Sequence, residues 1–538
     1  MFSTLLSRKI IHKNLICAAF LSLGILLPDL FLGYGRILTC TIPTTTLLGV
    51  LGFSFLLSFV RNKWILVMII GLLIVTQTIQ VNHWAYFGAP IHSQDIIKAF
   101  VELDEIIPTG ISLARRFWPV WLTLGVSTVC IISALICTKD RKRLAHVWLV
   151  VVLVLGITPA LSYFKGPSFF YTKPTSSTIY NTVRAFSDWI IPKKKNKNLG
   201  YKPYNIVYGA PKVKNIILIM GESLSSRYMH LYGYEKPNTP YLDSLKNNPN
   251  FVFAKGISSS VSTEICLQLF FNMVHNPGFI ELIRKKDANL FRLAKHQGYK
   301  TFVVSGQNER LFHDTGTEFV DKFISIKDLQ QELKDKGDEV LLNTLSEFEF
   351  EQKNFIVIHL RHVHEPYSDY SKYLPDPITH AGSDDNRLSQ TQQHYSQAIG
   401  YHDYWVKQCV ATIQKLFSQD TMILFASDHG ELLGERGLFG HNQMQPEVAD
   451  IPIWAFAINA HTQLLSSLKN KIISHYDLGK YIAELIGVKI TNPNEEKTLQ
   501  FVHGSEIFTD YEFMPWEKDN EKAVFLRNQW VSMIPVKN

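Results

Sequence analysis

Hydrophobic residues are arranged differently in the two halves of this chain. Up to about Tyr163 they form long runs, whereas beyond about Lys165 they form runs of strand length separated by stretches with helical spacing. Five of the long runs approach the roughly 20 residues that span a bilayer. Five such runs in succession argue against buried core helices. We therefore predict an all-α transmembrane bundle of about five helices over residues 1–164, with spans at 14–34, 37–59, 64–81, 117–137 and 146–164.

Short basic clusters give the expected orientation of these spans. SRKIIHK precedes the first span, RNK joins the second and third, and KDRKR joins the fourth and fifth, so all three lie on one side if the chain crosses at every span. By the positive-inside rule this side is the cytoplasm, and the large carboxy-terminal half lies outside it. The net charge of +7 is mild and resides largely in such clusters, which indicates membrane topology and argues against a nucleic-acid partner.

The segment 82–116, between the third and fourth predicted spans, is expected to face outward as well. Its stretch SQDIIKAFVELDEII places apolar residues at roughly helical spacing, which is typical of an amphipathic helix on a membrane surface. Its acids form a solvated face or, in an alternative interpretation, place Glu102 near the headgroup of a substrate. Residues 165–210, which include the basic run KKKNK, are predicted to be a linker.

Residues 211–538 have the pattern of a second domain of the α/β class. Apolar runs of strand length end in polar residues, and the stretches between them have helical spacing, which predicts βα units and a mostly parallel sheet. Open α/β sheets bind ligands at the carboxyl ends of their strands. The four runs, each with the residues that follow it, are NIILIM with GES from 215, TFVVS with GQN from 301, NFIVIHL with RHVH from 354, and MILFA with SDH from 422.

Four side chains that follow these strands are expected to converge on one crevice: Glu222, His364, Asp428 and His429. Taken singly, each has a plainer interpretation, such as the cap of a following helix. Together they form a set of carboxylates and imidazoles that suits a divalent ion, either zinc or manganese. With His441, which follows later in the chain, His364 can hold a second ion or an anionic oxygen.

The segment GISSSVSTEICLQLFFN, residues 256–272, carries the candidate nucleophile. A turn rich in serine and threonine leads into an apolar helix that begins near Thr263. Serine and threonine are favoured at helix caps, so an ordinary cap is one interpretation. The amino terminus of a helix also attracts anions, and a nearby metal lowers the pKa of a hydroxyl group. Thr263 can therefore begin the helix and face a phosphoryl group at the same time.

In their order and spacing, these motifs resemble the membrane-bound phosphoethanolamine transferases of the alkaline phosphatase/sulfatase superfamily. The residues that carry the resemblance are NIILIMGES with HLYGYEKPNTPYLDSL, then STEICLQLFF, VIHLRHVHEPYSDY and ASDHGELLGERGLFGHN. The resemblance implies that the carboxy-terminal domain is alkaline-phosphatase-like and that Thr263 is the nucleophile. It also implies a catalytic zinc bound by Glu222, Thr263, Asp428 and His429.

The resemblance further implies that His364 and His441 contact the phosphoryl group or a second zinc, whereas His359 is structural. It implies a multi-pass protein of the inner membrane with its catalytic domain in the periplasm. The implied reaction moves phosphoethanolamine from phosphatidylethanolamine to an envelope glycolipid, either lipid A or the lipopolysaccharide core, through an intermediate on Thr263.

Other functions compatible with these residues are a phosphoglycerol transferase or phosphodiesterase of the same superfamily, and a non-catalytic protein that binds lipid. The complete set of implied ligands argues against a binding role alone. A sulfatase reaction is disfavoured, because its Cys/Ser-x-Pro-x-Arg motif is absent where Cys266 is followed by Leu-Gln-Leu-Phe. The outer domain has two cysteines, Cys266 and Cys409, so it can form at most one disulfide.

Overall fold

The computed structural model divides into two compact units, Met1–Lys195 and Asn196–Asn538, which are described separately. In the first unit it describes residues 8–34, 44–60, 62–87 and 118–136 together with the single positions 91, 96, 178, 181, 182 and 185. In the second unit it describes residues 202–278, 280–374, 387–460, 462–469, 471–505, 513–519 and 522–526.

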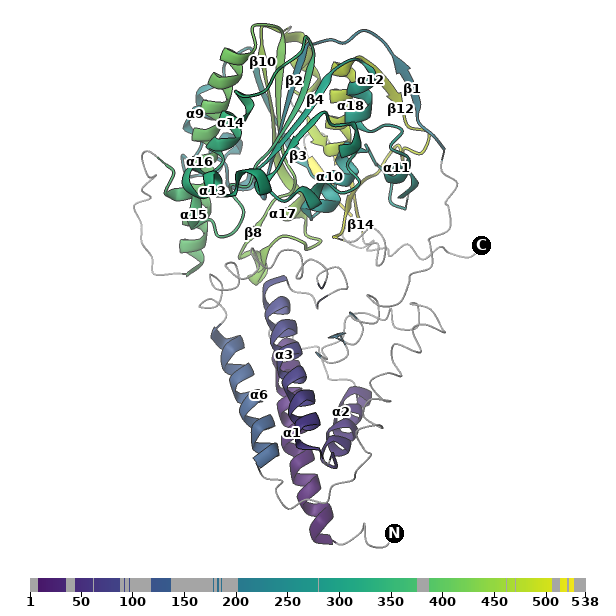
Figure 1. The fold of residues 1–538 in the computed structure, drawn as a ribbon, viewed down its shortest axis with the longest axis vertical. Coiled ribbons are helices and arrows are strands. Elements are labelled where there is room, and N and C mark those ends of the chain that lie inside the picture. The colour runs from purple at the N-terminus through teal and green to yellow at the C-terminus, as the bar shows by residue number, and fades with distance from the viewer. Residues whose placement is uncertain are drawn as a thin grey trace. The chain divides into compact units, whose positions relative to one another are not determined.

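Four helices form the described part of the first unit (Figure 1): α1 (Arg8–Tyr34), α2 (Thr44–Leu57), α3 (Lys63–Phe87) and α6 (Trp118–Ile136). They overlap four of the five predicted spans, while the fifth, at 146–164, lies outside the described residues. Among the described residues, only Trp64–His83 is long and apolar enough to cross a membrane, and the apolar parts of α1, α2 and α6 are shorter. A bundle of five spanning helices is therefore not confirmed.

Polar contacts hold these helices together at buried positions. Gln77 of α3 donates from Nε2 to the carbonyl of Ile25 in α1 at 2.8 Å, and Asn14 of α1 donates from Nδ2 to the Ser58 hydroxyl at 3.1 Å. Large apolar side chains point outward instead, including Leu48 and Met68 with exposed fractions of 63% and 67%. Such an apolar exterior suits lipid rather than water.

The second unit is built on an eight-stranded sheet. Its strand order is β11 (Ile472–Ser474), β3 (Phe251–Ile257), β10 (Asp450–Ile458), β7 (Thr421–Ser427), β2 (Asn215–Gly221), β6 (Asn354–His359), β4 (Lys300–Ser305) and β5 (Lys322–Ile324). All neighbouring strands are parallel except where β10 pairs antiparallel with β3 and with β7. The predicted, mostly parallel α/β sheet is confirmed, with one antiparallel strand.

Helices cover both faces of this sheet (Figure 1). On one face α9 (Pro240–Ser244), α14 (Glu339–Leu345) and α16 (Arg387–Leu416) bury a core that includes Trp405 and Phe425. On the other face α10 (Thr263–Phe271), α12 (Leu290–His296) and α18 (His475–Ile486) bury a core that includes Phe271 and Phe291. The central strands are buried on both sides, which explains why they are apolar throughout rather than alternating.

Smaller elements complete the second unit. The pair β1 (Asn205–Tyr208) and β12 (Val488–Thr491) is antiparallel, as are β8 (Leu432–Leu433) with β9 (Phe439–Gly440) and the sheet of β13 (Gln500–His503), β14 (Phe513–Asp519) and β15 (Lys522–Phe525). The remaining α-helices are α11 (Ile280–Lys285), α13 (Ile326–Lys336), α15 (Ser368–Ser371) and α17 (Pro446–Ala449).

The register of the central strands brings their polar ends to one edge of the sheet. Gly221 at the end of β2 pairs with Ser427 at the end of β7, and Met220 pairs with His359 at the end of β6. His359 in turn pairs with Ser305 at the end of β4. The residues that follow all four predicted strands therefore begin at the same level, and this edge carries the site.

Candidate metal centre

Four side chains meet at this edge, and we call them the inner group: Glu222, Thr263, Asp428 and His429. Glu222 follows β2, Asp428 and His429 follow β7, and Thr263 is the first residue of α10. The Thr263 hydroxyl lies 3.3 Å from Glu222 Oε2 and 3.1 Å from His429 Nε2. His429 Nε2 also lies 3.2 Å from Asp428 Oδ2. Potential ligand atoms of Glu222, Asp428 and His429 all lie within 4.8 Å of one another.

The turns after β2 and β7 hold each other in place. Asp428 Oδ1 accepts from the backbone N–H of Ser223 at 2.9 Å and from that of His429 at 2.7 Å. The Ser427 hydroxyl accepts from the backbone N–H of Leu224 at 2.8 Å. Ser223 has a φ of 53°, a left-handed conformation that a non-glycine residue adopts at an energetic cost. This strained turn aims the Glu222 carboxylate at the end of β7.

The tautomer of His429 follows from its neighbours. Its Nδ1 lies 3.0 Å from the carbonyl oxygen of Gly430, which can only accept, so Nδ1 carries the hydrogen. In the neutral form of His429, Nε2 therefore presents a lone pair toward Thr263 and Asp428. A backbone carbonyl that fixes the distal nitrogen in this way is typical of histidines that bind metal.

The charge balance of the inner group calls for a cation. Glu222, Asp428 and His429 are buried, and the ion-pair partner of both carboxylates within the described part of the chain is His429. Asp428 Oδ2 is a buried oxygen with no hydrogen-bond donor there. Uncompensated charges are costly to bury, and a divalent ion neutralises both carboxylates. The residues present fit such an ion.

The protonation preferences of the two carboxylates agree with this interpretation. Burial and the charge of Glu222 raise the pKa of Asp428 well above its ordinary value. Burial acts in the same direction on Glu222, but the charges of His429, His364 and His441 outweigh it and hold the pKa of Glu222 below its ordinary value. A proton thus replaces one negative charge when no cation does so, and metal binding releases that proton.

Gln307 orients Glu222 from the end of β4. Its Nε2 donates to Glu222 Oε2 at 2.7 Å and to the carbonyl of Leu360 at 2.8 Å. His359 supports it from behind, with Nε2 3.2 Å from Gln307 Nε2 and Nδ1 3.1 Å from the Ser305 hydroxyl. Gln307 was not among the residues predicted for the site. Its position after a predicted strand was the available signal, the same one that identified Glu222.

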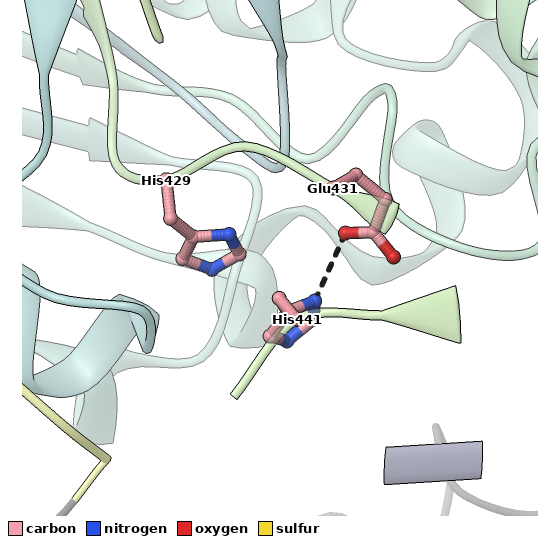
Figure 2. A group of neighbouring side chains, drawn as sticks. All are labelled: His429, Glu431 and His441. Atoms are coloured by element: carbon pink, nitrogen blue, oxygen red, sulfur yellow. Dashed lines mark hydrogen bonds and ion pairs between the residues drawn. The ribbon is translucent and has the colours of Figure 1, made fainter. Parts of the chain in front are cut away.

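Three further residues form what we call the outer group: His364, Glu431 and His441. His441 stacks near His429 with ring centroids 4.2 Å apart, and His364 lies 5.9 Å from His441 by the same measure. Glu431 Oε2 accepts from His441 Nδ1 at 3.1 Å (Figure 2), and its Oε1 accepts from the Tyr367 hydroxyl at 2.9 Å. His429, Glu431 and His441 form a second cluster that could hold an ion. Burial raises the pKa of Glu431 to about 7.

The site thus brings together six of the seven predicted residues, and Glu102 lies outside the described residues. Glu431 and Tyr367 were not predicted. Glu431 stands two residues after His429, and this spacing was a usable signal, whereas Tyr367 lacked one. The two cysteines of the second unit are both free and buried, so the disulfide considered from the sequence does not form.

A family model described as Sulfatase matches residues 214–488, just over half of the chain. The chain belongs to the sulfatase family. This sulfatase-family chain is 25% identical over 302 residues to the Kdo(2)-lipid A phosphoethanolamine 7''-transferase of Salmonella typhimurium, covering 51% of the chain and 52% of that relative. It is 27% identical over 235 residues to phosphoethanolamine transferase EptC of Escherichia coli K12, covering 40% of each.

The chain therefore spans about half the length, or less, of these curated relatives. The resemblance to phosphoethanolamine transferases predicted from the motifs is confirmed. Among solved structures, the integral membrane protein lipooligosaccharide phosphoethanolamine transferase A of Neisseria meningitidis aligns with 88% of the chain and 95% of its own length. The TM-score is 0.57 at 17% identity, which shows a shared fold.

Proposed function

We propose that this protein transfers phosphoethanolamine from phosphatidylethanolamine to an envelope glycolipid, either lipid A or the lipopolysaccharide core, through a phosphoethanolamine-threonine intermediate. The observation that carries the proposal is the Thr263 hydroxyl, which lies at the start of a nine-residue helix and contacts both Glu222 and His429. The names of the relatives support the transferred group and the lipid acceptor.

In the first step the Thr263 oxygen attacks the phosphorus of the donor lipid. The hydroxyl lies within hydrogen-bond distance of Glu222 Oε2 and of His429 Nε2, so these two groups are the proton acceptors that the site offers. The bond from phosphorus to the glycerol oxygen breaks, and diacylglycerol leaves after gaining a proton from His364 or His441. In the second step that histidine takes the proton of an acceptor hydroxyl, and the hydroxyl oxygen attacks the same phosphorus. The bond to Thr263 breaks, and the threonine oxygen regains its proton from the group that accepted it in the first step.

Charge on the phosphoryl oxygens is balanced by groups that the site already contains. The free N–H groups at the start of α10 and the positive end of its dipole attract an anion beside Thr263. His364 and His441 supply further hydrogen-bond donors at the half-buried side of the site. These groups favour a phosphoryl group over a neutral substrate.

We propose that Glu222, Thr263, Asp428 and His429 hold a divalent cation, zinc or alternatively manganese. When bound there, the cation lowers the pKa of the Thr263 hydroxyl and offsets negative charge on the phosphoryl oxygens. One nitrogen and three oxygens form a ligand set that zinc accepts. The three oxygen ligands suit manganese as well.

The experiment that tests this function is intact mass spectrometry of the metal-loaded full chain in detergent after incubation with phosphatidylethanolamine, followed by peptide mapping. We expect one phosphoethanolamine on the peptide that contains Thr263 and release of diacylglycerol. Thr263→Ala should carry no adduct and keep most of its metal. Thr344→Ala is the matched control, because it removes a buried threonine hydroxyl that bonds to the Val340 carbonyl within its own helix.

The other outcomes separate the alternatives. A phosphoglycerol adduct formed from phosphatidylglycerol, with none from phosphatidylethanolamine, would assign a phosphoglycerol transferase instead. Release of diacylglycerol without an adduct, if it persists in the Thr263→Ala variant, would indicate hydrolysis by another nucleophile. Neither adduct nor release from either lipid would leave lipid binding as the function.

A further inference from the structure

His475, the first residue of α18, is a buried imidazole between the two loops that build the inner group. Its Nε2 lies 2.9 Å from the carbonyl oxygen of Ser427, at the end of β7. Its Nδ1 lies 3.1 Å from the backbone nitrogen of Ser259, in the loop that leads to Thr263. One side chain therefore contacts the metal-ligand turn on one side and the nucleophile loop on the other.

Both contacts require the same neutral tautomer. The Ser427 carbonyl can only accept, so Nε2 carries the hydrogen, and the Ser259 N–H can only donate, so Nδ1 presents its lone pair. Burial lowers the pKa of His475 to about 3, which keeps the ring neutral at ordinary pH. The imidazole thus has both nitrogens bonded to backbone and none left for proton transfer.

Cys266 makes a parallel connection one turn into α10. Its Sγ donates to the carbonyl oxygen of Asp428 at 2.9 Å and lies 3.2 Å from His475 Nδ1. The consecutive carbonyls of Ser427 and Asp428 are therefore held by side chains from α18 and α10. These carbonyls belong to the two peptide units that join Ser427 to Asp428 and Asp428 to His429, so they fix the backbone of both proposed ligands.

The loop that leads to Thr263, which we call the nucleophile loop, is also held by backbone hydrogen bonds to other segments, and these make it rigid. The Ser259 carbonyl accepts from the backbone N–H of His503 at 2.8 Å, and the Val261 carbonyl accepts from that of Asn442 at 2.8 Å. Because these contacts fix the loop from outside, the spacing between the loop and the turn after β7 depends on the side chains that bridge them.

We propose that His475, assisted by Cys266, is a positioning residue that sets the distance between Thr263 and the metal-ligand turn Asp428–His429. The inference rests on the proposed function in naming Thr263 as the nucleophile and Asp428 and His429 as metal ligands. The Thr263 hydroxyl is 3.1 Å from His429 Nε2, and small displacements of a reacting group have large effects on rate. Groups behind metal ligands also contribute about 10- to 100-fold to metal affinity.

Two substitutions separate the halves of this connection. The amide nitrogen of His475→Gln can occupy the place of Nε2 and donate to the Ser427 carbonyl, but it offers a poorer acceptor to Ser259. The amide oxygen of His475→Asn can occupy the place of Nδ1 and accept from Ser259, but it does not reach Ser427. His475→Ala removes both contacts, and Cys266→Ala removes the bond to Asp428 together with the contacts of the sulfur to His475 and Ser259.

The test measures two quantities on the full chain in detergent. Zinc affinity is determined by competition with a chelator, and the rate of adduct formation on Thr263 is determined over a range of phosphatidylethanolamine concentrations. We expect His475→Ala to lower zinc affinity by about 10-fold or more and the maximal adduct rate by about 100-fold, with KM nearly unchanged. His475→Gln should restore zinc affinity and His475→Asn should not.

His275→Gln and His275→Ala are the matched controls. His275 is a buried histidine next to the ring of Tyr476, the residue after His475, and its Nδ1 bonds to Asn276 rather than to the site. Their zinc affinity and adduct rate should match those of the unchanged chain. His475 variants that equal these controls in both quantities would overturn the inference, even if all of the variants lose thermal stability alike.

The two proposals fail in different ways. If the unchanged chain forms the adduct and the His475 variants do so equally fast with equal zinc affinity, the positioning role is wrong and the proposed function stands. If zinc affinity follows the expected order but no adduct forms on Thr263 in any chain, the positioning role at the metal turn stands and the nucleophile assignment is wrong. A chain that binds no zinc would overturn the inference outright.

Discussion

The inner group and the outer group are held in different ways. The side chains of Glu222, Asp428 and His429 are 0% exposed. Backbone groups at the strand ends hold Asp428 and His429, and Gln307 at the end of β4 holds Glu222. His441 is 17% exposed, and its Nδ1 bonds the side chain of Glu431 at 3.1 Å. The inner group is thus positioned by residues at the strand ends of the sheet. The outer group lies on loops that are held by hydrogen bonds between side chains.

This difference separates binding the ion from handling the substrate. A rigid, fully buried set is suited to an ion of fixed coordination, because displacement of any ligand exposes an uncompensated charge. His364 and His441, which are half-buried on loops, can adjust to a phosphoryl group that enters and leaves. We therefore expect changes in the inner group to remove metal and activity together, and changes in the outer group to reduce activity while the metal stays.

The largest effect is expected for Asp428→Asn. It keeps the size of the side chain but removes the charge of the buried oxygen that faces His429. Zinc content should fall below about one tenth of that in the unchanged chain. The rate of adduct formation on Thr263 should fall by about 1000-fold or more. Asp403→Asn is the control, since Asp403 is equally buried but bonds the backbone N–H groups of Tyr241 and Leu242. Full zinc occupancy in Asp428→Asn, measured by elemental analysis, would remove Asp428 from the ligand set.

A smaller effect is expected for His441→Asn in the outer group. The imidazole next to His429 is lost, so the adduct rate should fall by about 100-fold through loss of stabilisation of the phosphoryl group, while the zinc of the inner group is retained. His230→Asn is the matched control, because His230 also bonds a carboxylate, that of Asp243 at 2.6 Å, but away from the site. Loss of zinc in His441→Asn together with activity would show that the two groups act as one.

The sequence was sufficient for the inner group because its geometry follows from strand ends. Glu222 and Asp428 each come directly after a buried run, and parallel neighbours must end at one edge. Which strand runs antiparallel to the others could not be predicted, since β10 is as uniformly apolar as the parallel strands of the sheet. Tyr367 was missed for a related reason: a hydrogen bond between side chains on separate loops leaves no periodic pattern in either segment.

The outer group was predicted only in part for the same physical reason. His364 was expected at the crevice because it follows a predicted strand, His441 was proposed with it for a second ion or an anionic oxygen, and Glu431 was overlooked although it follows His429 by two residues. Its role depends on a contact with His441 across the hairpin of β8 and β9, and a contact of this kind is set by tertiary structure.

His359, which lies behind Gln307 and the inner group, should make the stability of the fold sensitive to acid. Burial lowers the pKa of His359 from 6.5 to about 4, so the folded chain resists a proton that the unfolded chain binds. This contribution to stability is present above pH 6.5 and is lost as the pH falls toward 4. At pH 5 the free energy of unfolding is therefore about 2 kcal/mol lower than it is above pH 6.5.

The measurement compares unfolding of the unchanged chain and of His359→Gln at pH 7.5 and at pH 5. The glutamine variant has no proton to gain at this position, so its deficit in unfolding free energy should shrink by about 2 kcal/mol at the lower pH. A deficit of the same size at both pH values would mean that His359 is not kept neutral by the fold. Metal-loaded protein is used throughout, so that loss of zinc does not contribute.

The smallest effect is expected for Tyr367→Phe, which tests how the outer group is held. The change removes only the hydroxyl that donates to Glu431 Oε1, and one such bond contributes about 1 kcal/mol. We expect the adduct rate to fall by about fivefold with zinc content unchanged, because Glu431 then holds His441 less firmly. Tyr370→Phe is the matched control, since its hydroxyl donates to the Arg361 carbonyl from the same short segment. If both variants lose activity equally, the loop as a whole matters rather than the bond to Glu431, and the outer group would be positioned by its backbone after all.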